Sequence, residues 1–176
     1  MTSDKEVMEL ALGYARQSLT AGCAPIGAIL TNSNGNVVGW GRSTIVPVGD
    51  GKKTRVSVSH VELALIQREA EADRLHPDNA PYTLHVTLEP CHMCMGAAIV
   101  ARIDRVIWCL DDFWGGATSM YNMSKEYMKM RLPDLVRTPY PDLQRQAADM
   151  WVEHLDQYGL PEYAERMLRW QTRVEV

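Results

Sequence analysis

The stretch EPCHMC occupies residues 89–94 and places two cysteines three positions apart. Such a pair is either a redox couple or half of a metal site, and six residues alone leave both readings open. The preceding YTLHVTL alternates apolar and polar residues and predicts a strand, whereas residues 93–101 predict a helix rich in small residues. The apolar run RVIWCL, residues 105–110, predicts a second strand buried on both faces. Strand, helix and strand in this order predict a parallel crossover in an α/β fold.

The N-terminal part of the chain predicts a helix followed by an antiparallel pair of strands. Ser3 and Glu6 fit a capping box for a helix over about 4–20. The apolar runs IGAIL and VVGW flank the turn NSNGN, whose Asn-Gly pair is typical of a hairpin. A long loop over 44–59, which contains the basic run GKKTR, then leads into a helix expected from residue 60 to about 74.

Length and composition predict a single domain over residues 1–176, with 119–176 as a mainly helical extension of its core. The N-terminus has no secretory pattern and no stretch is long enough to span a bilayer, so we expect a cytoplasmic protein without membrane contact. Thiols stay reduced there, which favours metal ligation or packing over disulfides for the four cysteines. A net charge of -4 argues against nucleic acid as a partner, because proteins that bind phosphate backbones usually carry a basic face.

The stretch SHVEL, residues 59–63, supplies the residues that EPCHMC lacks for a metal site. His60 and Glu62 stand at the start of one expected helix, and Cys91 and Cys94 at the start of another. Residues two apart project about 200° from each other in a regular helix, so His60 and Glu62 share a cavity only if it lies beyond the helix end. One imidazole and two thiolates suit a catalytic Zn²⁺, which keeps its fourth position for water. We therefore predict one zinc ion on the histidine and the two cysteines, with Glu62 beside it as the catalytic proton shuttle.

These residues resemble the cytidine/deoxycytidylate deaminase superfamily, whose signature is His-x-Glu followed by Pro-Cys-x-x-Cys. The signature reads HVE at 60–62 and PCHMC at 90–94, and the resemblance extends over about residues 21–118, nearest to the cytosine, guanine and transfer-RNA adenosine deaminases. It implies a three-layer α/β/α sandwich on a five-stranded mixed sheet, assembled as a homodimer. It also implies hydrolytic deamination of a small amino-substituted nucleobase or related heterocycle, with release of ammonia.

The same resemblance indicates where a substrate would be contacted. The candidates are Ile26 in APIGA, Ser43 in GWGRST, Glu89 before the proline, and Asp112 and Trp114 in LDDFWGGA. Relatives often carry a substrate-reading asparagine near the end of the second strand, where this chain has Gly41, Arg42 or Ser43. Trp114 and the preceding Phe113 can stack on a planar base, cap the core or bury a dimer contact.

Other functions remain open at this point. A transfer-RNA adenosine deaminase shares the motif but needs a surface that follows phosphates, and a nucleoside or nucleotide deaminase needs polar groups that GKKTR can supply. A thiol oxidoreductase would use EPCHMC alone, and a non-catalytic zinc module would keep only the fold.

Four further residues are expected to have structural roles or none. We expect His85 to be a hydrogen-bonded structural histidine on its strand, and Cys23 and Cys109 to pack as buried thiols. His154 sits in polar sequence and is expected at the surface.

Overall fold

The computed structural model describes residues 2–45, 58–118, 126 and 130–171, so most of the expected 44–59 loop, including GKKTR, lies outside the described residues. The helices are α1 (Asp4–Thr20), α2 (Val61–Glu71), α3 (His92–Val100), α5 (Pro141–Gln157) and α6 (Pro161–Gln171), with a short 3-10 helix η1 (Pro77–Asn79). The strands are β1 (Gly27–Thr31), β2 (Val37–Arg42), β3 (Thr83–Leu88), β4 (Arg105–Leu110) and β5 (Asp134–Arg137). Across these residues, no helix has the length and apolar character needed to cross a membrane.

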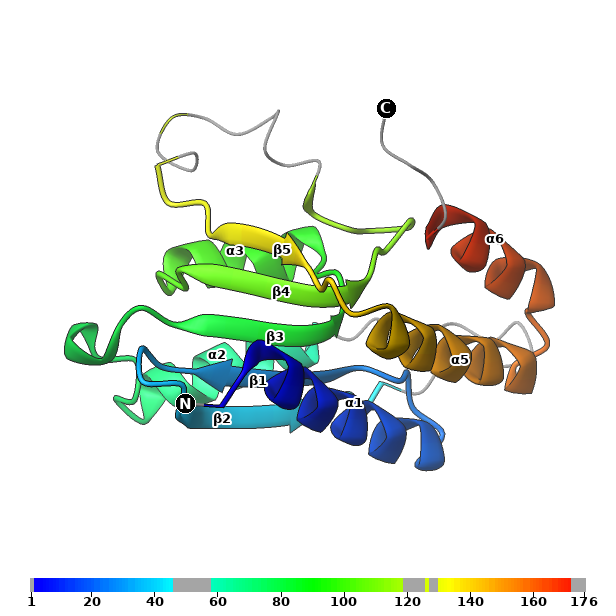
Figure 1. Cartoon of the computed structure of the whole chain (residues 1–176), viewed down its shortest axis with the longest axis horizontal. Helices are drawn as coiled ribbons and strands as arrows, with labels where there is room; N and C mark the ends of the chain where they lie inside the picture. Colours follow the sequence, from blue (N-terminus) through cyan, green and yellow to red (C-terminus); the bar gives the residue numbers. More distant parts are fainter. Residues whose placement is uncertain (1, 46–57, 119–125, 127–129, 172–176) are drawn as a thin grey trace.

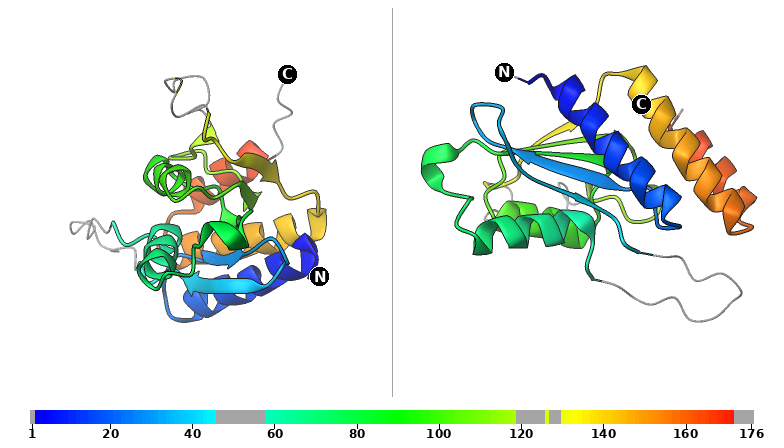
Figure 2. Two further views of the ribbon diagram at one scale, coloured as in Figure 1. Left: turned by 90° about the vertical axis from the view of Figure 1, so that its left-hand side faces the viewer. Right: turned by 90° about the horizontal axis from the view of Figure 1, so that it is seen from below.

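The strands of the described residues form one mixed sheet in the order β2-β1-β3-β4-β5. β1 pairs antiparallel with β2 and β3, while β4 pairs parallel with β3 and β5. Helices α1 and α5 cover one face of this sheet, and α2 and α3 cover the other (Figures 1 and 2). The expected three-layer α/β/α sandwich on a five-stranded mixed sheet is therefore confirmed, together with the parallel β3-α3-β4 crossover.

Helix α1 begins at the capping box that the sequence predicts. The Ser3 backbone N–H donates to the Glu6 carboxylate at 2.7 Å, and the Glu6 N–H donates to the Ser3 hydroxyl. Two of the four N–H groups that a helix start leaves without a partner are satisfied in this way. The helix then presents Val7, Ala11 and Leu12 to the sheet, all of them buried.

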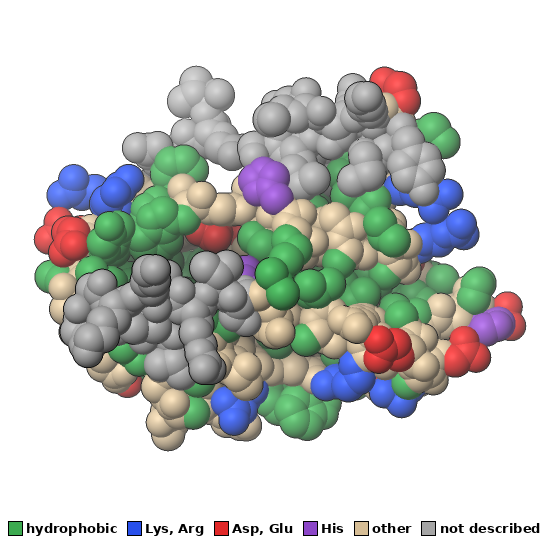
Figure 3. Space-filling view, turned by 180° about the vertical axis from the view of Figure 1, so that it is seen from behind, with side chains coloured by type: hydrophobic (Ala, Val, Ile, Leu, Met, Phe, Trp, Pro, Cys, Tyr) green, Lys and Arg blue, Asp and Glu red, His purple; other side chains and the backbone are tan. Residues whose placement is uncertain are grey.

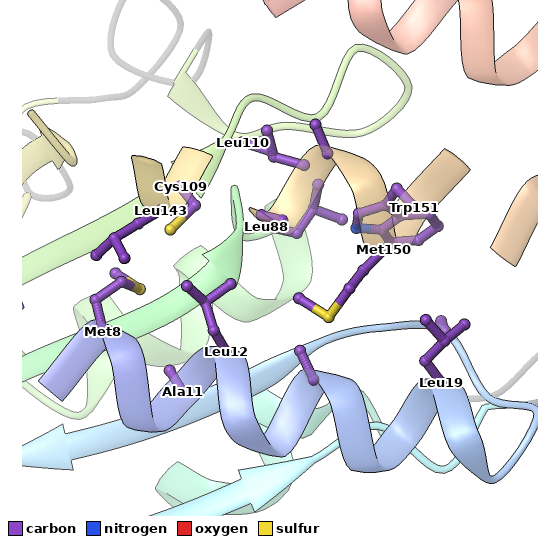
Figure 4. Close-up of a cluster of buried hydrophobic side chains, with 14 of the residues drawn as sticks. Met8, Ala11, Leu12, Leu19, Leu88, Cys109, Leu110, Leu143, Met150 and Trp151 are labelled. Carbon is purple, nitrogen blue, oxygen red and sulfur yellow. The ribbon is translucent and has the colours of Figure 1, made fainter. Parts of the chain in front are cut away.

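Each face of the sheet carries its own hydrophobic core. Side chains of α1 and α5 meet the ends of β3 and β4 on one face, as Figure 4 shows for Met8, Ala11, Leu12, Leu19, Leu88, Cys109, Leu110, Leu143, Met150 and Trp151. On the other face, α2 and α3 pack through Leu65, Met95 and Ile99 against Leu84 and Val86. Since burying a large aliphatic side chain stabilises a fold by roughly 1.5–3 kcal/mol, both helix layers are firmly attached to the sheet. The expected burial of the Cys23 and Cys109 thiols is confirmed.

Strand β3 is buried on both faces, including the face that carries its polar residues. His85 is only 1% exposed, and its Nε2 lies 3.0 Å from Asp4 Oδ1. Arg105 on β4 donates to the other Asp4 oxygen at 2.7 Å. His85 thus joins the start of α1 to the centre of the sheet, which is the structural role that the sequence predicts.

The C-terminal tail contributes a strand that the sequence reading, which expected a mostly helical tail, did not predict. Asp134–Arg137 pairs parallel with Arg105–Trp108 as β5, between Pro133 and Pro139. A four-residue edge strand is too short to give a clear alternation, and its partner on β4 lies far away in sequence. The helical expectation holds for α5 and α6, each of which has a proline, Pro141 or Pro161, at its first position.

His154 is buried, and the expectation of a surface position was wrong. Its side chain is 2% exposed and its ring lies 5.5 Å from the Trp151 ring and 5.1 Å from the Tyr158 ring. Ala147, Trp151 and His154 are spaced by four and three residues and therefore share the face of α5 that meets the core. The polar neighbours in sequence lie on the opposite face of the helix.

Replacing His154 with leucine should reduce the sensitivity of the fold to acid. Burial lowers the pKa of His154 from its ordinary 6.5 to about 4, so between these values only the unfolded chain binds the proton. The free energy of unfolding therefore falls as the pH drops through this window, by at most about 3 kcal/mol for this one group at about 1.4 kcal/mol per pKa unit. The measurement is urea unfolding of the zinc-loaded protein near neutral pH and near pH 5. The free energy of unfolding should differ less between these two pH values for His154→Leu than for wild type.

The matched control is His76→Gln, a change at a half-exposed histidine in front of η1. In this variant, the free energy of unfolding should differ between the two pH values by as much as it does in wild type. An equal loss of stability in wild type and His154→Leu would contradict the account.

Candidate active site

The predicted metal ligands lie at the beginnings of two neighbouring helices on one face of the sheet. His60 is the N-cap of α2 and Cys91 is the N-cap of α3, both with extended backbone angles. Neither side chain makes a capping hydrogen bond, so both are available to bind something else. Because an N-cap residue lies outside the helical spiral, its side chain reaches past the helix end, where Glu62 and Cys94 of the first turns can meet it.

The spacing of the three ligand atoms fits a zinc ion. One nitrogen of His60 and the sulfurs of Cys91 and Cys94 lie within 4.8 Å of one another, and Cys91 Sγ is 3.5 Å from His60 Nδ1. Zinc bond lengths of about 2.3 Å to sulfur and 2.0 Å to nitrogen at a tetrahedral angle require a separation of about 3.5 Å between these two atoms. An imidazole and two thiols are also the donor types that zinc prefers. The chain thus has a metal centre for one zinc ion at this position.

The two sulfurs of this centre differ in acidity. The thiol of Cys94 donates to Cys91, and together with backbone N–H groups at the start of α3 this lowers the pKa of Cys91 to about 5. The same hydrogen bond, together with burial, raises the pKa of Cys94. Cys91 is half-buried while Cys94 is fully buried. The pair therefore holds one negative charge readily, and a cation between the sulfurs would favour a second.

Glu62 lies in the first turn of α2, next to the three ligand atoms but not among them. Its side chain is 4% exposed, and burial, together with the negative charge of Cys91, raises its pKa to about 7. Its own backbone N–H, His60 and Cys94 partly offset this rise. The carboxylate thus lies beside the metal centre, and its catalytic role stays a prediction.

Gly41 on β2 sets how closely α2 approaches the sheet. A β-carbon at this position would lie 2.8 Å from Cγ2 of Val61, the first residue of α2. A larger residue would therefore push away the turn that carries His60 and Glu62. Gly41 therefore serves close packing between β2 and α2.

Glu89 holds the segment that closes over the cysteines. It is 4% exposed, and its carboxylate accepts hydrogen bonds from the backbone N–H groups of Asp112 and Thr118, both at 2.9 Å, and from the Thr118 hydroxyl at 2.7 Å. A β-carbon on Gly116 would lie 2.2 Å from Glu89 Oε2, so only glycine fits beneath the carboxylate. The sequence prediction of a substrate contact stays a prediction, whereas these contacts make Glu89 a positioning residue for residues 112–118.

The 112–118 segment lies directly on the first turn of α3. Gly116 forms a β-bridge with Cys91, the Ala117 N–H donates to the Pro90 carbonyl at 3.0 Å, and His92 Nδ1 is 3.2 Å from the Gly115 carbonyl. Asp112 is half-buried here, and burial followed by the negative charge of Cys91 raises its pKa. The charge of Asp112, one of the predicted substrate contacts, therefore interacts with the metal centre.

The other three predicted contacts lie in different surroundings. Ile26 is half-buried between the two cores, next to β1. Ser43 is 2% exposed; its N–H donates to the Ile26 carbonyl and its hydroxyl accepts from the Ile45 N–H. Trp114 is 52% exposed and stacks on Phe113, with ring centroids 4.1 Å apart. Each role in substrate binding stays a prediction.

Two aromatic residues near this segment were missed in the sequence reading. Tyr163 lies 5.1 Å from the Trp114 ring and Trp170 lies 6.3 Å from the Phe113 ring, measured between centroids. Both belong to α6, where a spacing of seven residues places them on one side of the helix. That spacing is visible in the sequence, but nothing in it shows that α6 returns to the end of β4.

Comparison with known families identifies this arrangement. Residues 1–110 match the family model for the cytidine and deoxycytidylate deaminase zinc-binding region. The tRNA-specific adenosine deaminase of Bacillus subtilis is 30% identical over 128 residues, which are 72% of this chain and 74% of that protein. The tRNA(Ile)-lysidine synthase of Deinococcus radiodurans is 33% identical over 79% of this chain, but the match spans only about a quarter of that relative, 25% of its length.

Solved structures share the fold. One, from a study of A-to-I editing by tRNA:A34 deaminases at the wobble position of transfer RNA, is 31% identical, with a TM-score of 0.62, and the match covers 83% of this chain and 99% of that one. The guanine deaminase from Nitrosomonas europaea matches with a TM-score of 0.65 over 88% of this chain and 85% of its own, at 16% identity. The second likeness supports the fold alone.

Removing one sulfur from the metal centre should abolish zinc binding. Cys94→Ala leaves two ligands, and the lost metal affinity should also lower the thermal midpoint, because metal binding is coupled to folding. Zinc per chain, measured by elemental analysis after dialysis, should fall from near one to near zero. Cys23→Ala, which removes a buried thiol outside the centre, should keep its zinc. Full zinc occupancy in Cys94→Ala would show that a ligand is misassigned.

Replacing Glu89 with glutamine should loosen the 112–118 segment without removing the metal. The amide NH2 group of glutamine would face the N–H and O–H groups of Asp112 and Thr118, which also donate. A buried polar group left without a partner lowers the free energy of unfolding by roughly 1–3 kcal/mol. Urea unfolding should show a loss of this size while zinc content stays near one per chain. Thr118→Val, which removes only one of the donors to this carboxylate, should lose less. Wild-type stability in Glu89→Gln would contradict the positioning role.

Proposed function

The chain belongs to the cytidine and deoxycytidylate deaminase family, and on this premise we propose that it hydrolytically deaminates adenosine in transfer RNA. Water adds to the ring carbon that bears the amino group and the carbon–nitrogen bond breaks, so the products are inosine and ammonia. The observation that carries the reaction class is the buried carboxylate of Glu62 beside the group of His60, Cys91 and Cys94.

The residues of the centre divide the chemistry between them. His60, Cys91 and Cys94 would hold the zinc ion, which would supply Lewis acidity to activate the attacking water. Glu62 takes a proton from the attacking water and passes it to the ring nitrogen beside the reacting carbon. The same carboxyl then takes the proton of the hydroxyl group added to the ring carbon and delivers it to the amine, so the carbonyl forms as ammonia departs. Its burial keeps solvent from competing for these protons.

The support for RNA as the substrate is the names of the relatives. The adenosine deaminases and the lysidine synthases that this chain resembles at 30% identity or more are both named for transfer RNA. This revises the expectation from sequence, in which the net charge of -4 favoured a small free heterocycle. Net charge sums over the whole surface, whereas binding depends on the groups that surround the site.

A free nucleobase is the second candidate substrate, and the acidic composition is the observation that favours it. The two are separated by measuring ammonia release from zinc-loaded protein with an anticodon stem-loop that contains adenosine at the wobble position, with adenosine, and with free guanine and cytosine. Turnover of the stem-loop above that of the free compounds supports the proposal. Turnover confined to free bases would replace it by the second candidate.

Replacing Glu62 with glutamine should stop the reaction while leaving the metal bound. Glutamine keeps the size of the side chain but cannot shuttle protons, so turnover should fall at least about 100-fold. Zinc content should remain near one per chain, because Glu62 is not among the three ligand residues. The measurement is ammonia release at saturating substrate, beside elemental analysis of the same sample.

The matched control is Glu71→Gln, at an exposed position at the end of the same helix, where the carboxylate accepts a hydrogen bond from Gln67. This variant should keep turnover within about twofold of wild type, as for other surface changes. Turnover near the wild-type level in Glu62→Gln would remove Glu62 from the mechanism.

A further inference from the structure

A cluster of aromatic rings lies beside the metal centre and extends away from it. Phe113 and Trp114 from the end of β4 contact Tyr163 and Trp170 from α6, and we call these four residues the aromatic platform. Trp114 is 52% exposed and Trp170 is 37% exposed. Large aromatic rings are normally covered in a folded chain, so two half-open tryptophans in one cluster mark a surface that binds something.

The platform also carries a cation. The guanidinium carbon of Arg166 lies 5.3 Å from the centre of the Phe113 ring, within the range of a cation–π contact. Arg166 is three residues after Tyr163 and four before Trp170, so the same side of α6 presents two rings and one positive charge. At the left-hand edge of Figure 3, the end of the molecule where α6 lies in Figure 1, hydrophobic, basic and acidic side chains lie side by side.

Hydrogen bonds fix α6 against the end of β4. The Gln171 side chain donates to the Asp111 carbonyl at 2.8 Å and accepts from the Asp111 N–H at 3.0 Å, and it also accepts from Arg137 on β5 at 3.1 Å. Ala164 and Met167, on another side of α6, are buried in the core shared with α1 and α5. The platform is therefore preorganised, and binding would need little ordering of side chains.

The platform is continuous with the segment that covers the cysteines. The Trp114 N–H donates to Asp112 Oδ1 at 2.9 Å. The next residue, Gly115, contacts His92, and Gly116 bridges to Cys91. Residues 112–116 therefore join the metal centre to Trp114 without a break in the chain, and Trp114 in turn contacts Tyr163 of α6.

We propose that the aromatic platform stacks the unpaired bases that flank the target base in a single-stranded RNA loop. This inference rests on the proposed function and specifies how the RNA is held. A free base or nucleoside would occupy the metal centre alone and has no part that reaches α6. An RNA loop, in contrast, carries further bases on the same backbone. Stacking works with any base, and arginine among the rings adds attraction for an anionic strand, so a chain of net charge -4 can bind RNA without a broad basic face.

The test is equilibrium binding of an anticodon stem-loop RNA to zinc-loaded protein made inactive by Glu62→Gln. Fluorescence anisotropy gives the Kd for this background and for the same background with Trp170→Ala. Loss of one stacking ring should raise the Kd about 5- to 100-fold. Trp170→Phe in the same background keeps a ring and should bind within about threefold of the parent, as expected if stacking and not bulk decides the affinity.

The matched control is Trp40→Ala, which removes another exposed tryptophan, stacked on Tyr14 at the β2 edge of the sheet. The control should leave the Kd unchanged, and the thermal midpoint of every variant shows that it is folded. A Kd for Trp170→Ala equal to that of the control would overturn the proposal. A lower molecular mass of Trp170→Ala by light scattering, with unchanged RNA binding, would also overturn the proposal. The platform would then be a contact with a second copy of the chain.

The binding test is independent of the test for deamination, because it measures affinity for RNA and not turnover. RNA binding that depends on Trp170 but is not followed by ammonia release in wild type would uphold the platform and remove the proposed deamination of RNA. Deamination of the stem-loop with a Kd that ignores Trp170 would do the reverse.

Discussion

The structure depends on the close packing of two helix N-termini against one face of the sheet. All four residues of the centre lie at a helix cap or in a first turn: His60 and Cys91 are the N-caps, and Glu62 and Cys94 are the second residue of α2 and the third of α3. Helices α2 and α3 pack together over Leu84 and Val86, and Gly41 lets α2 come close. Because side chains at an N-cap point past the helix axis, this packing gathers a nitrogen, two sulfurs and a carboxylate that no single regular helix could bring together. The exposed N–H groups of α3 add a favourable field for thiolates.

A second layer of contacts holds the cover of the centre in place. Glu89 precedes the cysteines in sequence, yet its carboxylate accepts hydrogen bonds from Asp112 and Thr118 after β4, so the same stretch that supplies the ligands also fixes what lies above them. The cost of burying this carboxylate is offset by these hydrogen bonds from two N–H groups and one hydroxyl. From Asp112 onward the cover runs into Trp114 and α6, which joins the C-terminal tail to the chemistry of the centre.

Much of the centre could be predicted from sequence because its determinants are local. The spacing of His60 and Glu62, and of Cys91 and Cys94, together with helix starts at both places, is enough to place a zinc centre without coordinates. The features that could not be predicted from the sequence all depend on contacts between segments that lie far apart in the chain. β5 is short and pairs with a strand far away in sequence, His154 is polar but follows the buried side of α5, and Trp170 reaches Phe113 only because α6 folds back. Glu89 illustrates the same limit, since its position in the motif suggests a substrate contact while its hydrogen bonds lie with residues 112–118.

The central claim is that one zinc ion is bound by ligands from two helix N-termini with Glu62 beside it. X-ray absorption at the zinc edge of the purified protein measures that ligand set directly. The account predicts two sulfurs at about 2.3 Å and light atoms, one of them a histidine nitrogen, at about 2.0–2.1 Å. A first shell without sulfur, or one of four sulfurs, would contradict it, because His60, Cys91 and Cys94 could then not be the ligands together.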